Sequence, residues 1–341
     1  MAASAAALAL HRSSLVVDGL IFQSDGSAGA IRAGGAHAVN LTVSGFNADF
    51  AETCDQMAVW HARLEEPNSP WLLVRRASDI EKARAGGKLG LIMGWQNMRP
   101  IEDKLQRLAF FHAGGVRVMQ LTYNERNFVG DGCLEPGNGG LSTFGKRAIA
   151  EMNRLGIAID LSHVGERTSL DACAASTKPV LVTHANARAV AEAPRNKSDA
   201  VIKAVAATGG LIGVSVYGPM CWDGHSTTRP SLADFLRHVD HVAALIGPER
   251  MSFGTDFPGV DDLSKVAGVI ASTLARYPGA VSKYAQLFGN DIRTRYLSDC
   301  ATIAELPNMT DALLRHGWTE AQVKGLLGEN LKRVLGEIWG G

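Results

Sequence analysis

Two short apolar runs of this chain each end in a histidine. They are residues 157–163, IAIDLSH, and residues 180–184, VLVTH, and a segment typical of a helix separates them. Short runs rich in Val and Ile that alternate with helices predict parallel βαβ units. Active sites of α/β folds form at the carboxyl ends of such strands, so His163 and His184 are candidate metal ligands. The alternative is two ordinary histidines at loop starts, but their matching positions on successive strands favour metal binding.

A carboxylate follows a third run of the same kind. Asp256 is the penultimate residue of the run 251–257, MSFGTDF, and small residues around it would allow a ligand to approach closely. Imidazole and carboxylate together suit a zinc-type ion, which lowers the pKa of a bound water to about 7. The combination therefore predicts metal-assisted hydrolysis, with Asp256 as a third ligand or as the general base. Its alternative role is to cap a loop.

The elements that must position these residues form a regular series. Eight strand candidates alternate with helical segments, at residues 15–21, 37–43, 89–95, 116–123, 157–163, 180–184, 211–217 and 251–257. Eight such units predict a (β/α)8 TIM barrel. Without a repeat of fixed period or a linker, a single domain over residues 1–341 is the simplest interpretation, with a helical C-terminal extension from about residue 260. A doubly wound open sheet is the alternative fold.

Composition excludes several classes of function. The 341 residues are 46% hydrophobic, and Lys+Arg and Asp+Glu both number 34, so we expect a large core and neither a nucleic-acid surface nor a basic membrane patch. Five scattered cysteines without a CxxC motif indicate a reducing compartment, and hence a cytoplasmic protein. No apolar run reaches 18 residues, so we expect no membrane span. The Ala-rich start lacks a basic region and predicts a ragged or helical lead-in rather than a signal peptide.

Several motifs resemble those of the membrane (renal-type) dipeptidases, peptidase family M19, which are binuclear zinc peptidases built on a (β/α)8 barrel. The similar segments are GGLSTFGKRAIAEMNRLGIAIDLSHVGERT, VLVTHANARAV, PRNKSD, FGTDFPG and the C-terminal GENLKRVL. The resemblance covers nearly the whole chain. It implies that His163 and His184 bind one zinc ion and that Asp256 handles protons at the other. It also implies that Arg195 holds a substrate carboxylate, a task that a bidentate guanidinium performs well.

The chain departs from the family pattern at the first metal position. The family begins with Asp-Gly-His-x-Asp, whereas residues 18–22 read DGLIF, and Leu20 and Phe22 cannot coordinate zinc. The family's bridging glutamate is matched by Gln96, which brings no charge to offset the repulsion between two dications. A family histidine that contacts substrate is matched by Tyr123, which Asn124 follows. The resemblance therefore implies a divergent member that lacks part of the binuclear site.

These substitutions remove the ligands of the first metal ion, whereas both histidines that bind the second ion are kept. We therefore expect a site with a single zinc ion, bound by His163 and His184 with Asp256 as third ligand or general base. Cys133 and Gln96 are secondary candidates for ligands, although an ordinary loop residue is the simpler interpretation of Cys133.

The expected function is that of a dipeptidase-like metallohydrolase. It would cleave an amide C–N bond in a small substrate by metal-activated water. Arg195, Tyr123 and Asn124 would bind the substrate, whose carboxylate would meet Arg195. One alternative is a different hydrolase or a lyase on the same scaffold. The other is a catalytically inactive barrel that binds a small molecule. The resemblance and the long C-terminal extension also indicate a homodimer.

Overall fold

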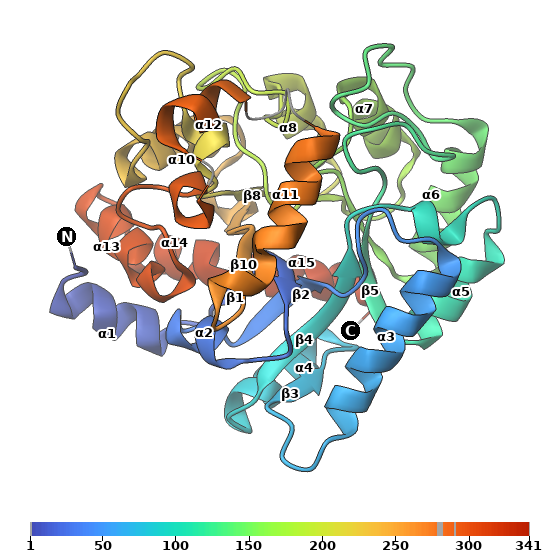
Figure 1. The fold of residues 1–341 in the computed structure, drawn as a ribbon, viewed down its shortest axis with the longest axis horizontal. Helices are drawn as coiled ribbons and strands as arrows, with labels where there is room; N and C mark the ends of the chain where they lie inside the picture. Colours follow the sequence, from blue (N-terminus) through green and yellow to red (C-terminus); the bar gives the residue numbers. More distant parts are fainter. Residues whose placement is uncertain (1, 278–281, 290, 341) are drawn as a thin grey trace.

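The computed structural model describes residues 2–277, 282–289 and 291–340, and a curled parallel sheet forms its centre (Figure 1). The sheet order is β10-β1-β2-β4-β5-β6-β7-β8-β9, and every paired strand is parallel to its neighbour. The strands are β1 (Val17–Ser24), β2 (Ala38–Thr42), β4 (Leu89–Trp95), β5 (Val116–Gln120), β6 (Ala158–Asp160), β7 (Leu181–Val182), β8 (Leu211–Val214), β9 (Met251–Phe253) and β10 (Phe257–Gly259).

The last two strands close the sheet into a barrel. β9 pairs with β8, while β10 pairs with β1, and between them the Asp256 amide donates to the Leu20 carbonyl at 3.0 Å. The buried carboxyl group of Asp18 reinforces the closure, because it accepts from the Thr255 amide at 2.9 Å and the Thr255 hydroxyl at 2.6 Å. The predicted (β/α)8 barrel is confirmed, and the open sheet is excluded.

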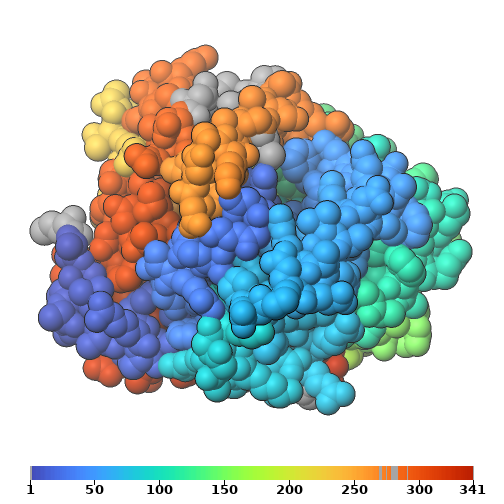
Figure 2. All heavy atoms as spheres, turned by 60° about the horizontal axis from the view of Figure 1, so that its bottom comes forward, coloured from blue at the N-terminus to red at the C-terminus, as the bar shows by residue number. Residues whose placement is uncertain are grey.

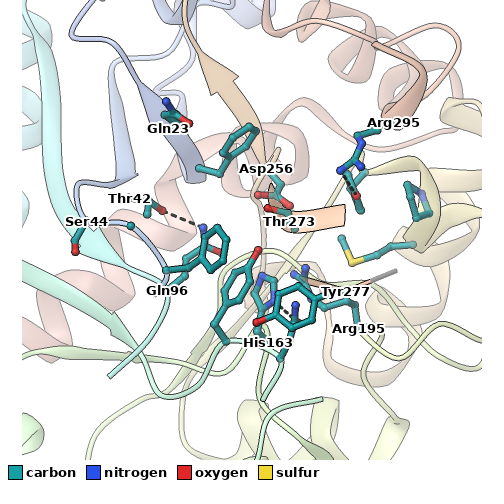
Figure 3. Close-up of a pocket in the computed structure, with 18 of the residues that line it drawn as sticks. Gln23, Thr42, Ser44, Gln96, His163, Arg195, Asp256, Thr273, Tyr277 and Arg295 are labelled. Atoms are coloured by element: carbon teal, nitrogen blue, oxygen red, sulfur yellow. Dashed lines mark hydrogen bonds between the residues drawn. The ribbon is translucent and has the colours of Figure 1, made fainter. Parts of the chain in front are cut away.

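The predicted eighth strand is interrupted where it meets β1. Asp256 has a φ of 58°, in the left-handed region that non-glycine residues seldom adopt, so the strand 251–257 divides into β9 and β10. The turn directs the Asp256 side chain into the cavity at the carboxyl end of the barrel (Figure 3).

Helices surround the barrel (Figure 1), and local signals set their ends. The outer helices are α3 (Phe50–Glu65), α4 (Ala77–Ala85), α5 (Gln106–Ala113), α6 (Thr143–Leu155), α7 (Glu166–Ala175), α8 (Asp199–Ala207) and α10 (Leu232–Ile246). In α6 the Ser142 hydroxyl accepts from the Gly145 amide, and Gly156 ends the helix with a φ of 75°. Ser231 and Asp234 form a capping box at the start of α10.

The C-terminal helix covers the amino ends of the strands. Leu331, Val334, Leu335 and Ile338 of α15 (Asn330–Trp339) pack in one apolar cluster with the first residues of several strands, which are Val17, Ala38, Ala158, Leu181 and Leu211. The helix therefore plugs the end of the barrel that lies opposite the carboxyl edge.

The predicted lead-in is a helix, α1 (Ala5–Ser13), and it is anchored to the C-terminal region. It packs on α13 (Pro307–Arg315), the Ser4 amide donates to Asp311 at 3.0 Å, and the His11 ring bonds with the Thr310 hydroxyl at 2.7 Å. The first and last parts of the sequence thus lie side by side (Figure 1).

The predicted C-terminal extension is also helical where the structure describes it. It contains α11 (Ala267–Arg276), α12 (Ser282–Phe288), α13 and α14 (Glu320–Lys324), together with short 3-10 helices at Leu263–Val266, Ile292–Arg295 and Ile303–Glu305 and a π-helical turn at Gly325–Glu329. Two further short helices are α2 (Gly29–Ala33) and α9 (Gly218–Cys221), and 3-10 turns occupy Arg99–Ile101 and Pro248–Arg250. On the face shown in Figure 2, orange segments of the extension lie against blue N-terminal segments.

Two findings complete the fold. A short strand that the pattern did not predict, β3 (Trp71–Leu73), pairs with the first three residues of β4. Among the helices of the described residues, none has both the length and the apolar character needed to cross a bilayer.

Candidate functional site

A cavity of about 480 Å³ lies at the carboxyl ends of the strands (Figure 3). Its inner wall is formed by residues within the last part of β1 and in the loops that follow the other strands. These include Phe22, Gln96, Tyr123, Asn124, His163, Arg195, Tyr217 and Asp256. The C-terminal extension supplies a second wall, made of Thr273, Tyr277, Ile292, Arg295 and Tyr296. The predicted extension therefore covers the mouth of the barrel.

A buried chain of hydrogen bonds orients His184. The Thr183 hydroxyl donates to the Asp160 carboxylate at 2.7 Å, so its oxygen is left to accept from Nδ1 of His184 at 2.8 Å. The Ser162 hydroxyl also donates to Asp160, at 2.6 Å. With its proton on Nδ1, the His184 ring carries a lone pair on Nε2.

His163 is also oriented by a hydrogen bond at Nδ1, but its partner is Asn124. Its Nδ1 donates to the amide oxygen of Asn124 at 2.8 Å, and its ring stacks on Tyr123 with the centroids 4.1 Å apart. The Asn124 oxygen also accepts from the Cys133 thiol at 3.3 Å, which supports this orientation of the amide. The lone pair of His163 is therefore also on Nε2.

The two imidazoles form a pair with free lone pairs. Their ring centroids are 5.3 Å apart, and both Nε2 atoms are buried without a hydrogen-bond partner among the described residues. Burial lowers the pKa of His163 and of His184 well below the ordinary value, and the nearby Arg195 lowers both further. Both rings are therefore neutral at pH 7, the form that coordinates metal ions.

Asp256 lies in the same cavity with a pKa near neutrality. Burial raises the pKa of its carboxyl group to about 6, although Arg195 and Arg295 both favour the charged form and lower it. The Tyr296 hydroxyl donates to the Asp256 carbonyl and fixes the backbone at this turn. A carboxyl group with such a pKa can both accept and return a proton at physiological pH.

Two guanidinium groups lie near this carboxyl group. Arg195 donates to the His184 carbonyl at 3.2 Å, and Arg295 donates to the Tyr217 hydroxyl at 3.4 Å. Figure 3 places Arg195 and Arg295 on one side of Asp256, while Gln96 and Thr42 lie on the other. The amide of Gln96 donates to the Thr42 hydroxyl at 3.1 Å. The cavity therefore has one cationic side and one neutral side.

The histidine pair fits part of one zinc site. Two buried imidazole nitrogens without partners are suitable donors, whereas no group of three or more His, Cys, Asp or Glu side chains in the described residues is arranged to hold a metal. Leu20, at the family's first metal position, is 2% exposed and packs in the core, and Phe22 lines the cavity. The residues therefore do not fit a binuclear centre. The role of Asp256 as a third ligand stays a prediction.

Most of the predicted site residues come together. His163, Asp256, Arg195, Tyr123, Asn124 and Gln96 all line the cavity. His184 and Cys133 lie directly behind its wall, His184 beside the ring of His163 and Cys133 against Asn124. Burial raises the pKa of the Cys133 thiol and so disfavours the thiolate that binds metals. Its role as a ligand also remains a prediction.

Sequence reasoning missed the residues from the extension. Arg295, Tyr277 and Tyr296 lie outside the strand-and-loop pattern that located the other site residues, and no motif marks them. Only the folding of the extension over the barrel brings them to the cavity.

Comparison with known proteins decides the family. The model of the membrane dipeptidases, peptidase family M19, matches residues 28–283. The chain belongs to this family. The resemblance inferred from the motifs of residues 139–199 and 253–259 is thereby confirmed.

Individual relatives of this chain include dipeptidases, in agreement with the family match. A dipeptidase of Clonostachys rogersoniana is 31% identical over 233 residues, which are 66% of this chain and 59% of the relative. A dipeptidase of Claviceps purpurea is 27% identical over 86% of this chain and 61% of its own length. The chain thus spans about three fifths of these fungal proteins. A solved amidohydrolase from Pseudomonas aeruginosa is 33% identical with a TM-score of 0.83, covering 98% of this chain and 99% of the other.

Proposed function

We propose that this protein hydrolyses an amide C–N bond in a small substrate that carries a carboxylate, in the manner of a dipeptidase. The observation that carries the proposal is the pair of oriented, unprotonated Nε2 atoms of His163 and His184 at the carboxyl edge of the barrel. Asp256 and Arg195 line the cavity at the same edge. Membership of the dipeptidase family supports the same reaction class.

Each side chain has a distinct task in this proposal. Arg195 binds the substrate carboxylate, and its bond to the His184 carbonyl fixes the guanidinium next to the histidine pair. Asp256 takes a proton from the attacking water and delivers it to the departing amine, for which a pKa of about 6 is suitable. The stacked ring of Tyr123 holds His163 in place and covers it with an apolar face.

We propose that His163 and His184 bind a single zinc ion. The lone pairs of the two rings fit one imidazole-bound ion, whereas Leu20, Phe22 and Gln96 offer no acid for a second. Zinc bound there would supply Lewis acidity toward the amide carbonyl and would activate water. Asn124 and Thr183 would contribute by keeping the protons on the Nδ1 atoms.

Two experiments test this function. Elemental analysis of protein purified without chelator should give about one zinc per chain, as expected for a centre with one set of ligands. The double variant His163→Ala, His184→Ala should lose that zinc and all turnover of a dipeptide panel. Zinc retained by the double variant would refute the assignment of the ligands.

A second candidate is a binding protein without catalysis. The observation that favours it is Phe22, an apolar cavity residue at a position where the family has a metal ligand. Binding of small amides without turnover in the presence of supplied zinc would establish this alternative. Turnover of any member of the panel would eliminate it. A non-peptidase hydrolase or a lyase would appear in the same screen as turnover of other small carboxylates.

We also propose that the protein acts as a cytoplasmic homodimer. The five free cysteines support a reducing compartment. The exposed side chains of Phe110 and Phe128 offer apolar surface for a contact between subunits. Light scattering coupled to size exclusion will give the mass in solution, and a monomeric mass would refute the dimer.

A further inference from the structure

The side chains that line the cavity carry an excess of positive charge before a ligand binds. Among its lining residues, Arg195 and Arg295 are the basic side chains and Asp256 is the acidic one. At the position of the family's bridging glutamate, this chain has Gln96, whose side-chain amide is neutral. The side chains that face a substrate therefore carry a net charge of about +1 even when Asp256 is ionised.

Arg295 is buried and forms no ion pair with any described residue. Its exposed fraction is 8%, and its Nη2 has no hydrogen-bond partner in the part of the chain that the structure describes. No ion pair within that part involves this guanidinium; its side-chain bond is to the neutral Tyr217 hydroxyl. A guanidinium stays charged at any physiological pH. Asp256, the acid in this cavity, is near Arg195 as well as Arg295, and it forms no ion pair with Arg295. Because a buried guanidinium with an unpartnered nitrogen is costly, this arrangement indicates an anionic group of a ligand.

The backbone holds Arg295 firmly at the cavity. It ends the 3-10 helix Ile292–Arg295, and the next residue, Tyr296, forms an antiparallel bridge with Tyr217, in the loop that follows β8. The Tyr296 hydroxyl also bonds to the Asp256 carbonyl. The backbone beside Arg295 is therefore attached to the barrel edge at two points, and the guanidinium itself donates to the Tyr217 hydroxyl.

Arg295 is a feature of this chain's extension. The match to the family model ends at residue 283, twelve positions before Arg295. The family's substrate arginine is matched instead by Arg195, which follows His184 closely in the sequence. The two guanidinium groups thus come from different parts of the chain and can serve different groups of one ligand.

We propose that the substrate is a small amide with two carboxylates, one bound by Arg195 and the other by Arg295. The inference rests on the proposed function, because it assigns the substrate class of the same site. Arg295 acts as a specificity-determining residue: it selects a dicarboxylate amide over a simple dipeptide with one carboxylate and a free ammonium group. The neutral Gln96 side of the cavity offers no acid to receive such an ammonium group.

Binding of a matched pair of compounds tests the proposal independently of turnover. N-acetyl-glutamate has an amide and two carboxylates, and N-acetyl-glutamine replaces one carboxylate by a neutral group of nearly the same shape. Calorimetry on the wild-type protein should give about tenfold tighter binding of N-acetyl-glutamate, as expected for one charge-assisted hydrogen-bonded pair. Equal affinities, or no binding of N-acetyl-glutamate, would overturn the inference.

Variants assign the preference to one side chain. Arg295→Gln should abolish the preference for N-acetyl-glutamate over N-acetyl-glutamine, whereas Arg295→Lys should restore part of it. Arg293→Gln is the matched control, because Arg293 belongs to the same 3-10 helix, is exposed and does not line this cavity. If Arg295→Gln does not fold, as thermal melting will show, the lysine variant and the wild-type ratio still decide. A preference that persists in a folded Arg295→Gln protein would refute the role of Arg295.

The outcome separates this inference from the proposed function. Hydrolysis of amides without a preference for dicarboxylates would refute the substrate class alone. Selective binding of N-acetyl-glutamate without hydrolysis of any amide would refute the proposed reaction and leave the role of Arg295 intact.

Discussion

The Thr183 hydroxyl is the point at which the orientation of His184 can be tested most directly. It donates to Asp160 and accepts from His184, at 2.7 and 2.8 Å. Thr183→Val keeps the shape of the side chain and removes both hydrogen bonds. Asp160 retains the Ser162 hydroxyl and two backbone amides as donors, whereas Nδ1 of His184 loses its acceptor.

The expected loss of stability can be estimated from these contacts. Two lost hydrogen bonds and one unsatisfied buried donor cost about 3 kcal/mol together. For a chain of 341 residues, an unfolding entropy of roughly 0.7 kcal/mol/K converts this loss to a decrease of about 4 °C in Tm. Calorimetry at pH 7 will measure the shift. Thr183→Ser, which keeps the hydroxyl, is the control and should retain both hydrogen bonds.

The same variant tests the link between the hydrogen-bond chain and the metal. Without the hydroxyl, nothing holds the proton of His184 on Nδ1, so we expect zinc affinity to fall by about 10- to 100-fold. Nitrogen NMR of the imidazoles will report the change of tautomer without any metal. If Thr183→Val melts like the wild type and keeps the tautomer on Nδ1, the orienting role assigned to this chain of hydrogen bonds is wrong.

Three further predictions follow from other parts of the site. Asp18→Asn should weaken the dependence of stability on pH: burial raises the pKa of Asp18 to about 7, so its contribution is complete below about 3.9 and is lost as the pH rises through 7. In urea denaturation the wild type should lose more stability than the variant between about pH 4 and about pH 7. Equal losses would contradict the assignment. Arg195→Gln should raise the KM for carboxylate-bearing substrates by about 10- to 100-fold with a smaller change in kcat, and steady-state kinetics that show the reverse would exclude substrate binding as its task. Asp256→Asn should lower kcat by about 10²- to 10⁴-fold while the Tm stays near that of the wild type, and a variant with normal kcat would show that another group moves the proton.

The barrel could be predicted because its strands are apolar and regularly spaced. The pattern did not predict where the histidine strands end. The run 180–184 forms a ladder over Leu181–Val182 alone, since the Thr183 and His184 amides donate to the side chains of Asp160 and Ser162. Polar side chains near a strand end compete with the ladder for backbone partners. The residues that shorten the strand are those that orient His184.

The missed strand has a different cause. β3 has three residues, and the interaction that anchors it is the edge-on contact of Trp71 with Trp60 of α3, at 5.3 Å between ring centroids. A run this short has no detectable period of its own. Its conformation depends on pairing with β4 and on packing, which are both tertiary effects.

Some residues of the candidate site could also be predicted from the sequence, and others could not. Residues attached to strand ends, such as His163 and Asp256, could be placed from the sequence because parallel strands bring their carboxyl ends to one edge. Arg295 could not be placed, since it reaches the cavity through a bridge between Tyr217 and Tyr296 that joins distant parts of the chain. The net charge of the cavity, and with it the substrate class, depends on this long-range contact.

The way the barrel closes also has a consequence for its synthesis. The hydrogen bonds between Asp18 and Thr255 join residues that are 237 positions apart, and α15 covers the amino ends of the strands with residues 330–339. In a polypeptide that emerges from the ribosome amino end first, β1 has no β10 to pair with until residues 257–259 are made. The apolar strand starts stay uncovered until residues 330–339 are made. Contacts of such high sequence separation form slowly, and the exposed edge can meanwhile pair with other chains. Yield in cells should therefore depend on chaperones that hold the nascent chain, more than on the stability of the finished barrel.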